Sequence, residues 1–226
     1  MMLYLSHIGL RADASCVERF PNQFVPRFGW ASSLVVEYYS QAVYEQRAIR
    51  ADNWGLSVVC NDVAGWGPTM VSSLECRWPI DFSGFLNGES DADIRRFMLD
   101  TMHHAARWAA DQNKWPTSVF EQAYQKVRER GLEFCGLTKV SYPSPDKRFT
   151  ARIHCDYGIE WIHYSAVLCR YRSKKEIVKT PLGKMRPRVG GAADDVAGGR
   201  WEHGKKFVLG SGWHHDWIAD FSEYMD

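Results

Sequence analysis

The sequence predicts an α+β protein: an antiparallel sheet with a central helical hairpin packed on one face, plus an irregular C-terminal tail rich in Gly and basic residues. Two observations carry this prediction. Residues 91–131 show the apolar spacing of two helices joined by a short linker, and residues 148–172 show the alternation of a β-hairpin. The chain of 226 residues is 45% hydrophobic and 24% charged, which is typical of a globular protein and unlike a disordered or fibrous one.

The N-terminal part of the chain is predicted to contain strands around one ambiguous segment. We expect strands at residues 1–10, 55–61 and 69–80, the last two separated by a turn at residues 64–68. Residues 32–52 contain neither Gly nor Pro and carry apolar residues at helical offsets, which favours a helix. The Val-Val and Tyr-Tyr pairs in this segment also suit a strand, so both interpretations stay open.

The centre of the chain predicts a helical hairpin. Ser90 or Asp91 can cap the first helix, Thr117 or Ser118 can cap the second, and Gly131 is the expected stop. Each helix carries one apolar stripe, which predicts that both pack on the sheet. The stripes consist of Ile94, Phe97, Met98, Thr101, Met102, Ala105 and Ala109, and of Phe120, Ala123, Tyr124 and Val127.

Three strands are expected after the helices, at residues 132–142, 148–157 and 159–172. A two-residue turn at Tyr157-Gly158 would join the last two strands and fix their register. One face of this hairpin is apolar and is the predicted core. It consists of Phe149, Ala151, Ile153 and Cys155 against Ile162, Tyr164, Ala166 and Leu168.

Regular patterning ends near residue 173, so we expect one α+β domain over residues 1–172. Residues 173–226 are expected to form a basic, Gly-rich and aromatic segment that packs on the same domain. Residues 170–190 hold eight basic residues and one acid, whereas residues 212–226 hold four acids and no Lys or Arg. The tail is therefore segregated by charge.

Composition and motifs narrow the classes of function. A net charge of +1 gives no whole-molecule field for nucleic acid or an anionic membrane. No stretch approaches the roughly 18 apolar residues of a membrane span, and the first residues lack the basic region of a secretory signal, so a cytoplasmic location is expected. The six cysteines show no C-x-x-C spacing and are expected to be free thiols. No phosphate-binding or nucleophile-elbow motif is present, and we expect no cofactor.

The polar face of the predicted hairpin is the first candidate site. In the predicted register His154 faces Trp161 and Arg152 faces His163, so the two imidazoles lie on a diagonal. Such a pair could serve as base and acid in metal-independent cleavage of a phosphodiester, with Arg152 binding the charge that develops on phosphorus. A ribonuclease or phosphodiesterase is therefore one hypothesis. The alternative is that these are ordinary polar residues on a solvated sheet face.

The C-terminal tail offers weak candidates for a metal site. His203, His214 and Asp216, together with His215, place imidazole and carboxylate ligands in a short span. Adjacent histidines point in different directions, and no H-E-x-x-H spacing is present, so no metal is assigned. A His/Asp metallohydrolase is the second alternative.

Our first hypothesis is a non-catalytic protein-binding domain of the immunity or inhibitor type, which recognises one protein partner such as a cognate effector or toxin. It depends on the aromatic content of 14% and on the charge-segregated tail, because aromatic and Arg side chains anchor protein interfaces. Residues 170–190 could also contact the phosphates of a nucleic acid. The candidate binding residues are Trp161, Trp201, Trp213, Trp217, Arg186 and Arg188.

Overall fold

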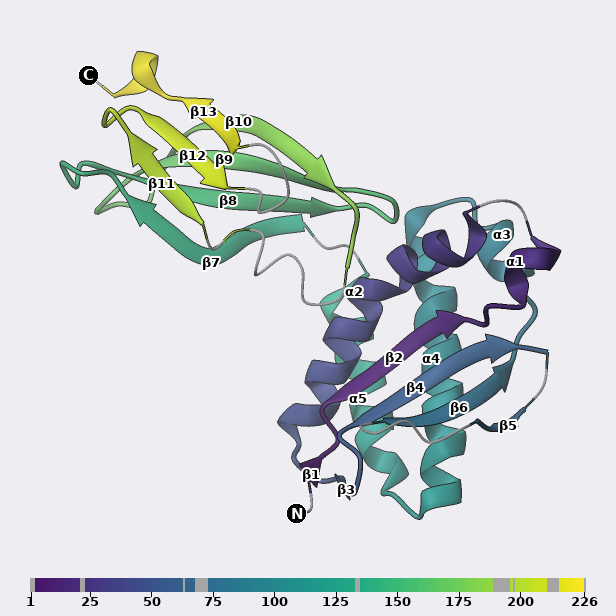
Figure 1. Cartoon of the computed structure of the whole chain (residues 1–226). Coiled ribbons are helices and arrows are strands. Elements are labelled where there is room, and N and C mark those ends of the chain that lie inside the picture. Colours follow the sequence, from purple (N-terminus) through teal and green to yellow (C-terminus); the bar gives the residue numbers. More distant parts are fainter. Residues whose placement is uncertain are drawn as a thin grey trace. The chain divides into compact units, whose positions relative to one another are not determined.

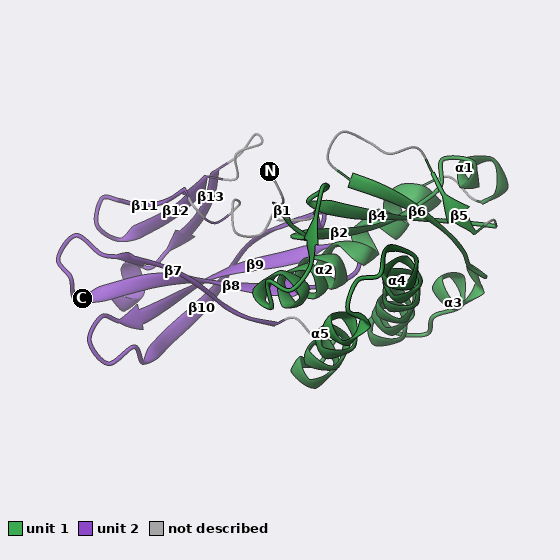
Figure 2. Cartoon of the chain, turned by 90° about the horizontal axis from the view of Figure 1, so that it is seen from below, with its two compact units in different colours: residues 1–132 green, residues 133–226 purple. Residues whose placement is uncertain are grey.

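The computed structural model describes two compact units, residues 1–132 and residues 133–226, and its mixture of helices and sheets confirms the α+β class (Figures 1 and 2). The boundary between the units falls directly after the helical hairpin, whereas the sequence expectation groups residues 1–172 together. The described residues are 3–20, 23–62, 64–67, 73–132, 135–188, 196, 198–210 and 216–225.

Unit 1 is a small sheet with helices on one face (Figure 2). The sheet order is β2-β4-β6-β5, and β2, β4 and β6 run parallel. The sequence did not predict this parallel sheet, and the helical hairpin packs on it. The elements of unit 1 are β1 (Leu3–Tyr4), β2 (His7–Ala12), α1 (Cys16–Arg19), α2 (Phe24–Glu45), β3 (Arg50–Ala51), β4 (Gly55–Asn61), β5 (Gly65–Trp66), β6 (Ser73–Pro79), α3 (Ser83–Leu86), α4 (Asp91–Asn113) and α5 (Thr117–Arg130).

The segment that the sequence left open between helix and strand belongs mainly to α2, so the helical interpretation is right. Two buried serines of this helix bind the backbone of β2. Ser32 Oγ donates to Leu10 O at 2.9 Å, and Ser40 Oγ accepts from Ile8 N at 2.9 Å. A helix between two adjacent parallel strands is the usual crossover connection, which explains why β2 and β4 are parallel.

The helical hairpin follows its predicted caps in part. Ser90 caps α4, because its side chain accepts a hydrogen bond from Asp93 N at 3.2 Å. Gly131, with a φ of 81°, follows the end of α5 as expected. The cap predicted at Thr117 or Ser118 is wrong: α5 begins at Thr117 without a side-chain cap.

A chain of polar groups runs from the buried Tyr39 to the exposed Arg107 and joins α2, α4 and α5. The Tyr39 hydroxyl lies 3.0 Å from His103 Nδ1, and His103 Nε2 lies 3.3 Å from a carboxylate oxygen of Glu121. Arg107 Nε binds the other oxygen of Glu121 at 2.9 Å. Tyr39 is fully buried and His103 is 5% exposed, so the imidazole satisfies a hydroxyl that water cannot reach.

Unit 2 contains two stacked antiparallel sheets, of order β10-β9-β8-β7 and β11-β12-β13 (Figure 1). Their facing side chains form one apolar core, which includes the whole predicted apolar face of the hairpin. The elements are β7 (Cys135–Pro143), β8 (Phe149–Tyr157), β9 (Ile162–Arg170), β10 (Glu176–Met185), β11 (Gly199–Glu202), β12 (Lys206–Gly210), β13 (Asp216–Asp220) and the 3₁₀ helix η1 (Ser222–Tyr224).

The register predicted for β8 and β9 is wrong by four residues. His154 faces Ser165 rather than Trp161, because the turn spans residues 158–161 and is closed by the bond from Gly158 N to Trp161 O at 2.9 Å. Ile159 in this turn is 4% exposed, so its burial favours the longer turn. An even shift keeps every side chain on its predicted face, which is why the predicted core is nevertheless right.

The C-terminal part of the chain is more regular than expected. β10 adds an edge strand beside β9, and β11, β12 and β13 form the second sheet. Gly183 lets β10 approach β13 closely, since a Cβ there would lie 2.5 Å from Cε2 of Trp217. These strands bury the apolar face of β8 and β9, so the hairpin packs on them.

Protonation of His103 should destabilise unit 1, because burial lowers the pKa of this imidazole below the usual value of about 6.5. Glu121 opposes this shift but has the smaller effect. The folded state therefore keeps a neutral ring while the unfolded chain takes up a proton, so the contribution is complete above about pH 6.5 and is lost as the pH falls. We expect the free energy of unfolding to decrease by at most about 1.4 kcal/mol per pH unit for this one proton.

Urea unfolding followed by helical circular dichroism measures this pH dependence, because the described α-helices all lie in unit 1. His103→Asn keeps an acceptor for Tyr39 near the Nδ1 position and removes the titrating group. Its unfolding free energy should therefore depend less on pH than that of the wild type. Equal pH dependence in the two proteins would show that His103 does not take up a proton on unfolding.

Candidate functional site

The outer face of the four-stranded sheet in unit 2 carries the three residues of the phosphodiesterase hypothesis, His154, His163 and Arg152. Its inner face is apolar and lies in the core, so alternation sends the polar side chains outward. The strand pairings place Cys135, Asp156, His163 and Lys184 in one row across β7, β8, β9 and β10. The neighbouring row places His154 beside Ser165. The face is thus dense in groups that bind or transfer protons.

His154 lies between a thiol and an ammonium group. Its Nε2 is 3.5 Å from Cys135 Sγ, and its Nδ1 is 3.1 Å from Lys179 Nζ. Burial lowers the pKa of His154, and the positive charge of Lys179 lowers it further, while Asp156 acts in the opposite direction. A neutral ring accepts a hydrogen bond from Lys179 at Nδ1 and donates one to sulfur from Nε2.

The two histidines of the phosphodiesterase hypothesis remain diagonal neighbours, but Arg152 does not join them. His163 faces Asp156. Arg152 comes four residues before Asp156 on β8 and faces Val167. The guanidinium of Arg152 donates to Thr138 O on β7 at 3.3 Å. His163 is exposed. The contact of Arg152 with His163 that the sequence predicted is therefore wrong.

Two cationic side chains lie over the ring of Trp161, which is the last residue of the turn before β9. The guanidinium carbon of Arg186 lies 3.8 Å from the centre of the indole ring, and Lys184 Nζ lies 4.3 Å from it. Arg186 also donates to Glu160 O at 3.1 Å, which holds the guanidinium in place. We call Trp161, His163, Lys184 and Arg186 the Trp161 patch. Trp161 and Arg186, which the sequence named separately, are brought together here.

Two other candidate tryptophans of the tail, Trp201 and Trp217, lie at the seam between the two sheets. Trp201 donates from its indole nitrogen to Tyr142 O at 2.9 Å, and its ring centre lies 5.7 Å from that of Phe207. Trp217 lies 5.2 Å from the ring of Tyr164. Both are partly buried against the core of unit 2. Trp213 lies outside the described residues, and Arg188 is exposed after β10.

The weak metal candidates are not gathered by the structure. His203 is exposed in the turn between β11 and β12, where its φ is 50°. Asp216 binds Arg200 at 2.5 Å. His214 and His215 lie outside the described residues. Within the part of the chain that the structure describes, no group of three His, Cys, Asp or Glu side chains is placed to hold a metal ion.

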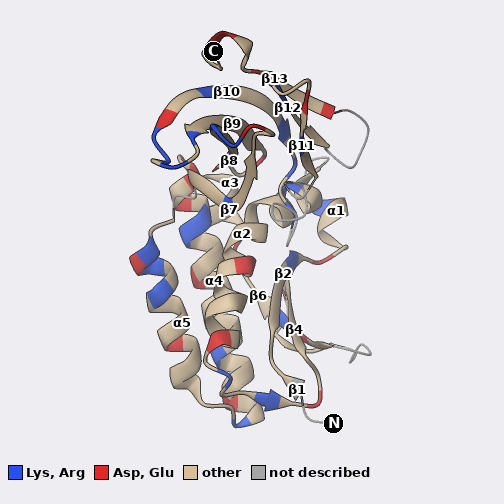
Figure 3. Cartoon of the chain, turned by 90° about the vertical axis from the view of Figure 1, so that its left-hand side faces the viewer, with Lys and Arg blue, Asp and Glu red and all other residues tan. Residues whose placement is uncertain are grey.

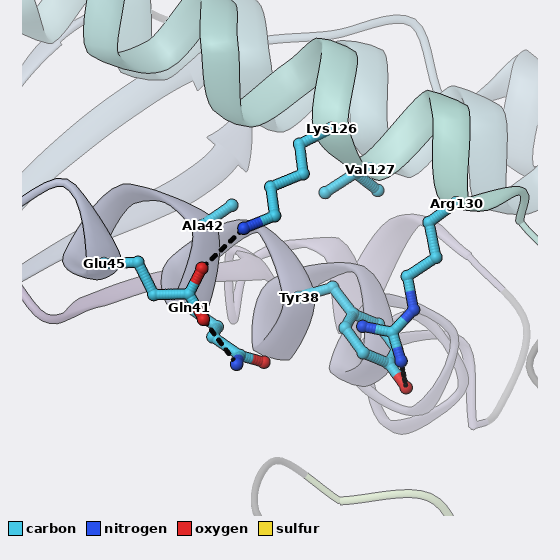
Figure 4. A pocket seen from close by; sticks show the side chains of 7 residues that line it. All are labelled: Tyr38, Gln41, Ala42, Glu45, Lys126, Val127 and Arg130. Carbon is cyan, nitrogen blue, oxygen red and sulfur yellow. Dashed lines mark hydrogen bonds and ion pairs between the residues drawn. The ribbon is translucent and has the colours of Figure 1, made fainter.

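Unit 1 contains a polar groove of about 240 Å³ between α2 and α5 (Figure 4). Lys126 Nζ binds Glu45 at 2.6 Å, and Gln41 donates to the same carboxylate at 2.8 Å. Arg130 lies over the ring of Tyr38, with its guanidinium carbon 3.7 Å from the ring centre. Glu45 and Lys126 bind each other and Arg130 binds Tyr38, so these charged groups are directed at neighbours within the groove.

Sequence reasoning did not find the contacts of His154 with Cys135 and Lys179. The sequence gives Cys135 as one of six expected free thiols and Lys179 as one of the basic residues within 170–190, with no partner for either. The strand register pairs Leu137 with His154, which places Cys135 one diagonal step away. Lys179 comes from an edge strand that the sequence did not predict, so no local pattern could have paired it with His154.

Comparisons of this chain with protein-family models, with curated proteins and with solved structures found no match. Among the residues that the structure describes, no helix has both the length and the apolar character needed to cross a membrane. The function is therefore argued from the geometry alone.

Removing the ammonium group beside His154 should raise the pKa of that imidazole. In Lys179→Met we expect the pKa of His154 to move up towards the usual value but to stay below it, because burial is the larger cause of the shift. NMR titration of the His154 ring protons measures the change. Lys184→Met is the matched control, since it removes the same charge from β10 beside His163. An equal response of His154 to both substitutions would contradict the contact with Lys179.

Proposed function

We propose that this chain is a non-catalytic binding protein of the immunity or inhibitor type that recognises one protein partner through the Trp161 patch. The observation that carries the proposal is the stacking of Arg186 on Trp161 at 3.8 Å. Trp and Arg are the residue types most enriched among the side chains that dominate interface affinity. A cognate effector or toxin is the partner class that this proposal implies.

The Trp161 patch is held in place before any partner binds. The indole is partly exposed at the start of β9, and Arg186 is fixed by the ring and by Glu160 O at 3.1 Å. Because these side chains already have defined positions, a partner would lose little conformational entropy in ordering them. The cations beside the ring favour a partner surface that presents carboxylates near an apolar group.

The ribonuclease hypothesis has weaker support. The two histidines are neighbours, but Arg152, the phosphate-binding cation of that hypothesis, is directed towards β7. The cation that pairs with His163 is Lys184 on β10, which lies over the Trp161 ring. Under the proposed function, purified wild-type protein does not cleave RNA. Cleavage that His154→Ala and His163→Ala both abolish would contradict the proposal in favour of the enzyme.

A nucleic-acid partner is the other expectation for residues 170–190. Lys184 and Arg186 of this range belong to the Trp161 patch, whereas its other basic residues include a group at the turn between β9 and β10, namely Arg170, Arg172, Lys174 and Lys175. This turn follows the last residue of β9, whereas Trp161 precedes the first, so the two surfaces are at opposite ends of one strand.

Substitution of Trp161 or Arg186 by Ala should weaken partner binding by about 2 kcal/mol, or roughly 30-fold. Affinity purification after cross-linking in the source cells, with wild type and variants in parallel, identifies candidate partners by mass spectrometry. Titration calorimetry with the purified partner then measures the affinity. Arg186→Ala leaves the indole in place, so it tests the patch even if Trp161→Ala unfolds the turn.

Trp54→Ala and Trp66→Ala are the matched controls, because both tryptophans belong to unit 1 and are 42% exposed. They should leave the affinity unchanged. Equal affinity of wild type, Trp161→Ala and Arg186→Ala for the partner would overturn the proposal, and so would equal losses in the control variants.

A further inference from the structure

Two turns at one end of the four-stranded sheet in unit 2 form a cluster of positive charge. The turn between β7 and β8 and the turn between β9 and β10 are joined by the hydrogen bond from Tyr171 N to Arg148 O at 3.0 Å. Lys and Arg, drawn in blue in Figure 3, gather at the second of these turns. We call the cluster the basic tip. It consists of Lys147, Arg148, Arg170, Arg172, Lys174 and Lys175.

Among the residues that the structure describes, ion pairs neutralise little of this charge. Asp146 binds Arg148 at 2.6 Å, and this contact with Arg148 holds the pKa of the Asp146 carboxyl well below its usual range. The other five cations form no ion pair with a described carboxylate. All six basic residues are exposed, so their field acts directly on solvent and on any anion that approaches.

The backbone fixes where these cations lie. Lys147 and Lys174 have φ angles of 55° and 54°, in the left-handed region that residues with a side chain seldom adopt. Lys174 N donates to Arg170 O, and Arg170 N donates to Lys175 O, both at 2.9 Å, so the turn between β9 and β10 is closed by its own hydrogen bonds. The tip therefore presents its charges from two tight turns rather than from a loose tail.

The one exposed aromatic residue among residues 144–148 and 170–175 indicates which anion fits. Tyr171 is 41% exposed and lies between Arg170 and Arg172 in the sequence. An exposed tyrosine ring can stack on an unpaired base while the cations of the same turns bind the phosphates. Apart from the ring of Pro145, these two turns carry no exposed aliphatic side chain to enter a lipid surface. A duplex would leave the Tyr171 ring without a base to stack on.

We propose that the basic tip is a binding site for single-stranded nucleic acid, with Tyr171 stacking on a base and the Lys and Arg side chains binding phosphates. The recognition is independent of sequence, because every base offers a ring face and no group is placed to read base edges. This site is separate from the Trp161 patch and does not depend on the proposed protein partner.

Fluorescence anisotropy with a labelled oligoadenylate of about 15 nucleotides tests the proposal on the full chain. We expect wild type to bind at low salt and the affinity to fall as salt rises. The triple variant Arg172→Gln, Lys174→Gln, Lys175→Gln should weaken binding at least about tenfold and reduce the slope of log K against log salt concentration by about 2. Tyr171→Ala should weaken binding about tenfold without changing that slope.

The matched control is Arg96→Gln, Lys114→Gln, Arg128→Gln, which removes three exposed positive charges from unit 1. It should bind the oligonucleotide as wild type does, and so should Arg186→Ala in the Trp161 patch. Circular dichroism confirms that each variant is folded. No binding by wild type at low salt, or an equal loss in the control triple variant, would overturn the proposal.

A second arm separates nucleic acid from other anions. Vesicles rich in phosphatidylserine should bind wild type more weakly than the oligonucleotide does at the same salt concentration. Equal binding to both, with Tyr171→Ala indistinguishable from wild type, would show an unselective anionic contact and would also overturn the proposal.

Discussion

The organisation of unit 2 depends on the alternation of side chains along β8 and β9. Phe149, Ile153, Tyr164 and Leu168 are at most 1% exposed, and burial of each large apolar side chain is worth about 2 kcal/mol. The second sheet supplies the other half of this core. Because this burial fixes which side chains point inward, the alternating side chains His154, Asp156 and His163 all point outward and lie on the same face.

This constraint explains which parts of the candidate site the sequence could predict. Period-two alternation identifies the face of each side chain, and a register error of four residues does not change it. The neighbours of each side chain do depend on the register. The sequence placed the turn at Tyr157-Gly158, but Ile159 is buried and Gly158 N binds Trp161 O. Arg152 therefore does not face His163 as predicted, whereas His154 and His163 are diagonal neighbours in both registers.

The strands of the tail and the parallel sheet of unit 1 were missed for different reasons. In β13 the buried Ala219 alternates with the exposed Ile218 and Asp220, whereas β12 buries three successive residues, and each strand has only five residues. So short an alternation is easily taken for a loop. The parallel pairing of β2 with β4 cannot be recognised from the residue pattern of either strand alone. It follows from the crossover through α2, the one segment whose helical state the sequence left open.

The two proposed surfaces belong to one rigid sheet yet act independently. β9 has nine residues, and at about 3.3 Å per residue its ends are about 30 Å apart. That distance exceeds the Debye length of about 8 Å at physiological ionic strength several-fold, so the charges of the basic tip do not alter the potential at Trp161. A chain with a net charge of +1 can therefore carry two local cationic surfaces of different chemistry. One offers an indole stacked against a guanidinium, and the other offers clustered charge around a single exposed phenol ring.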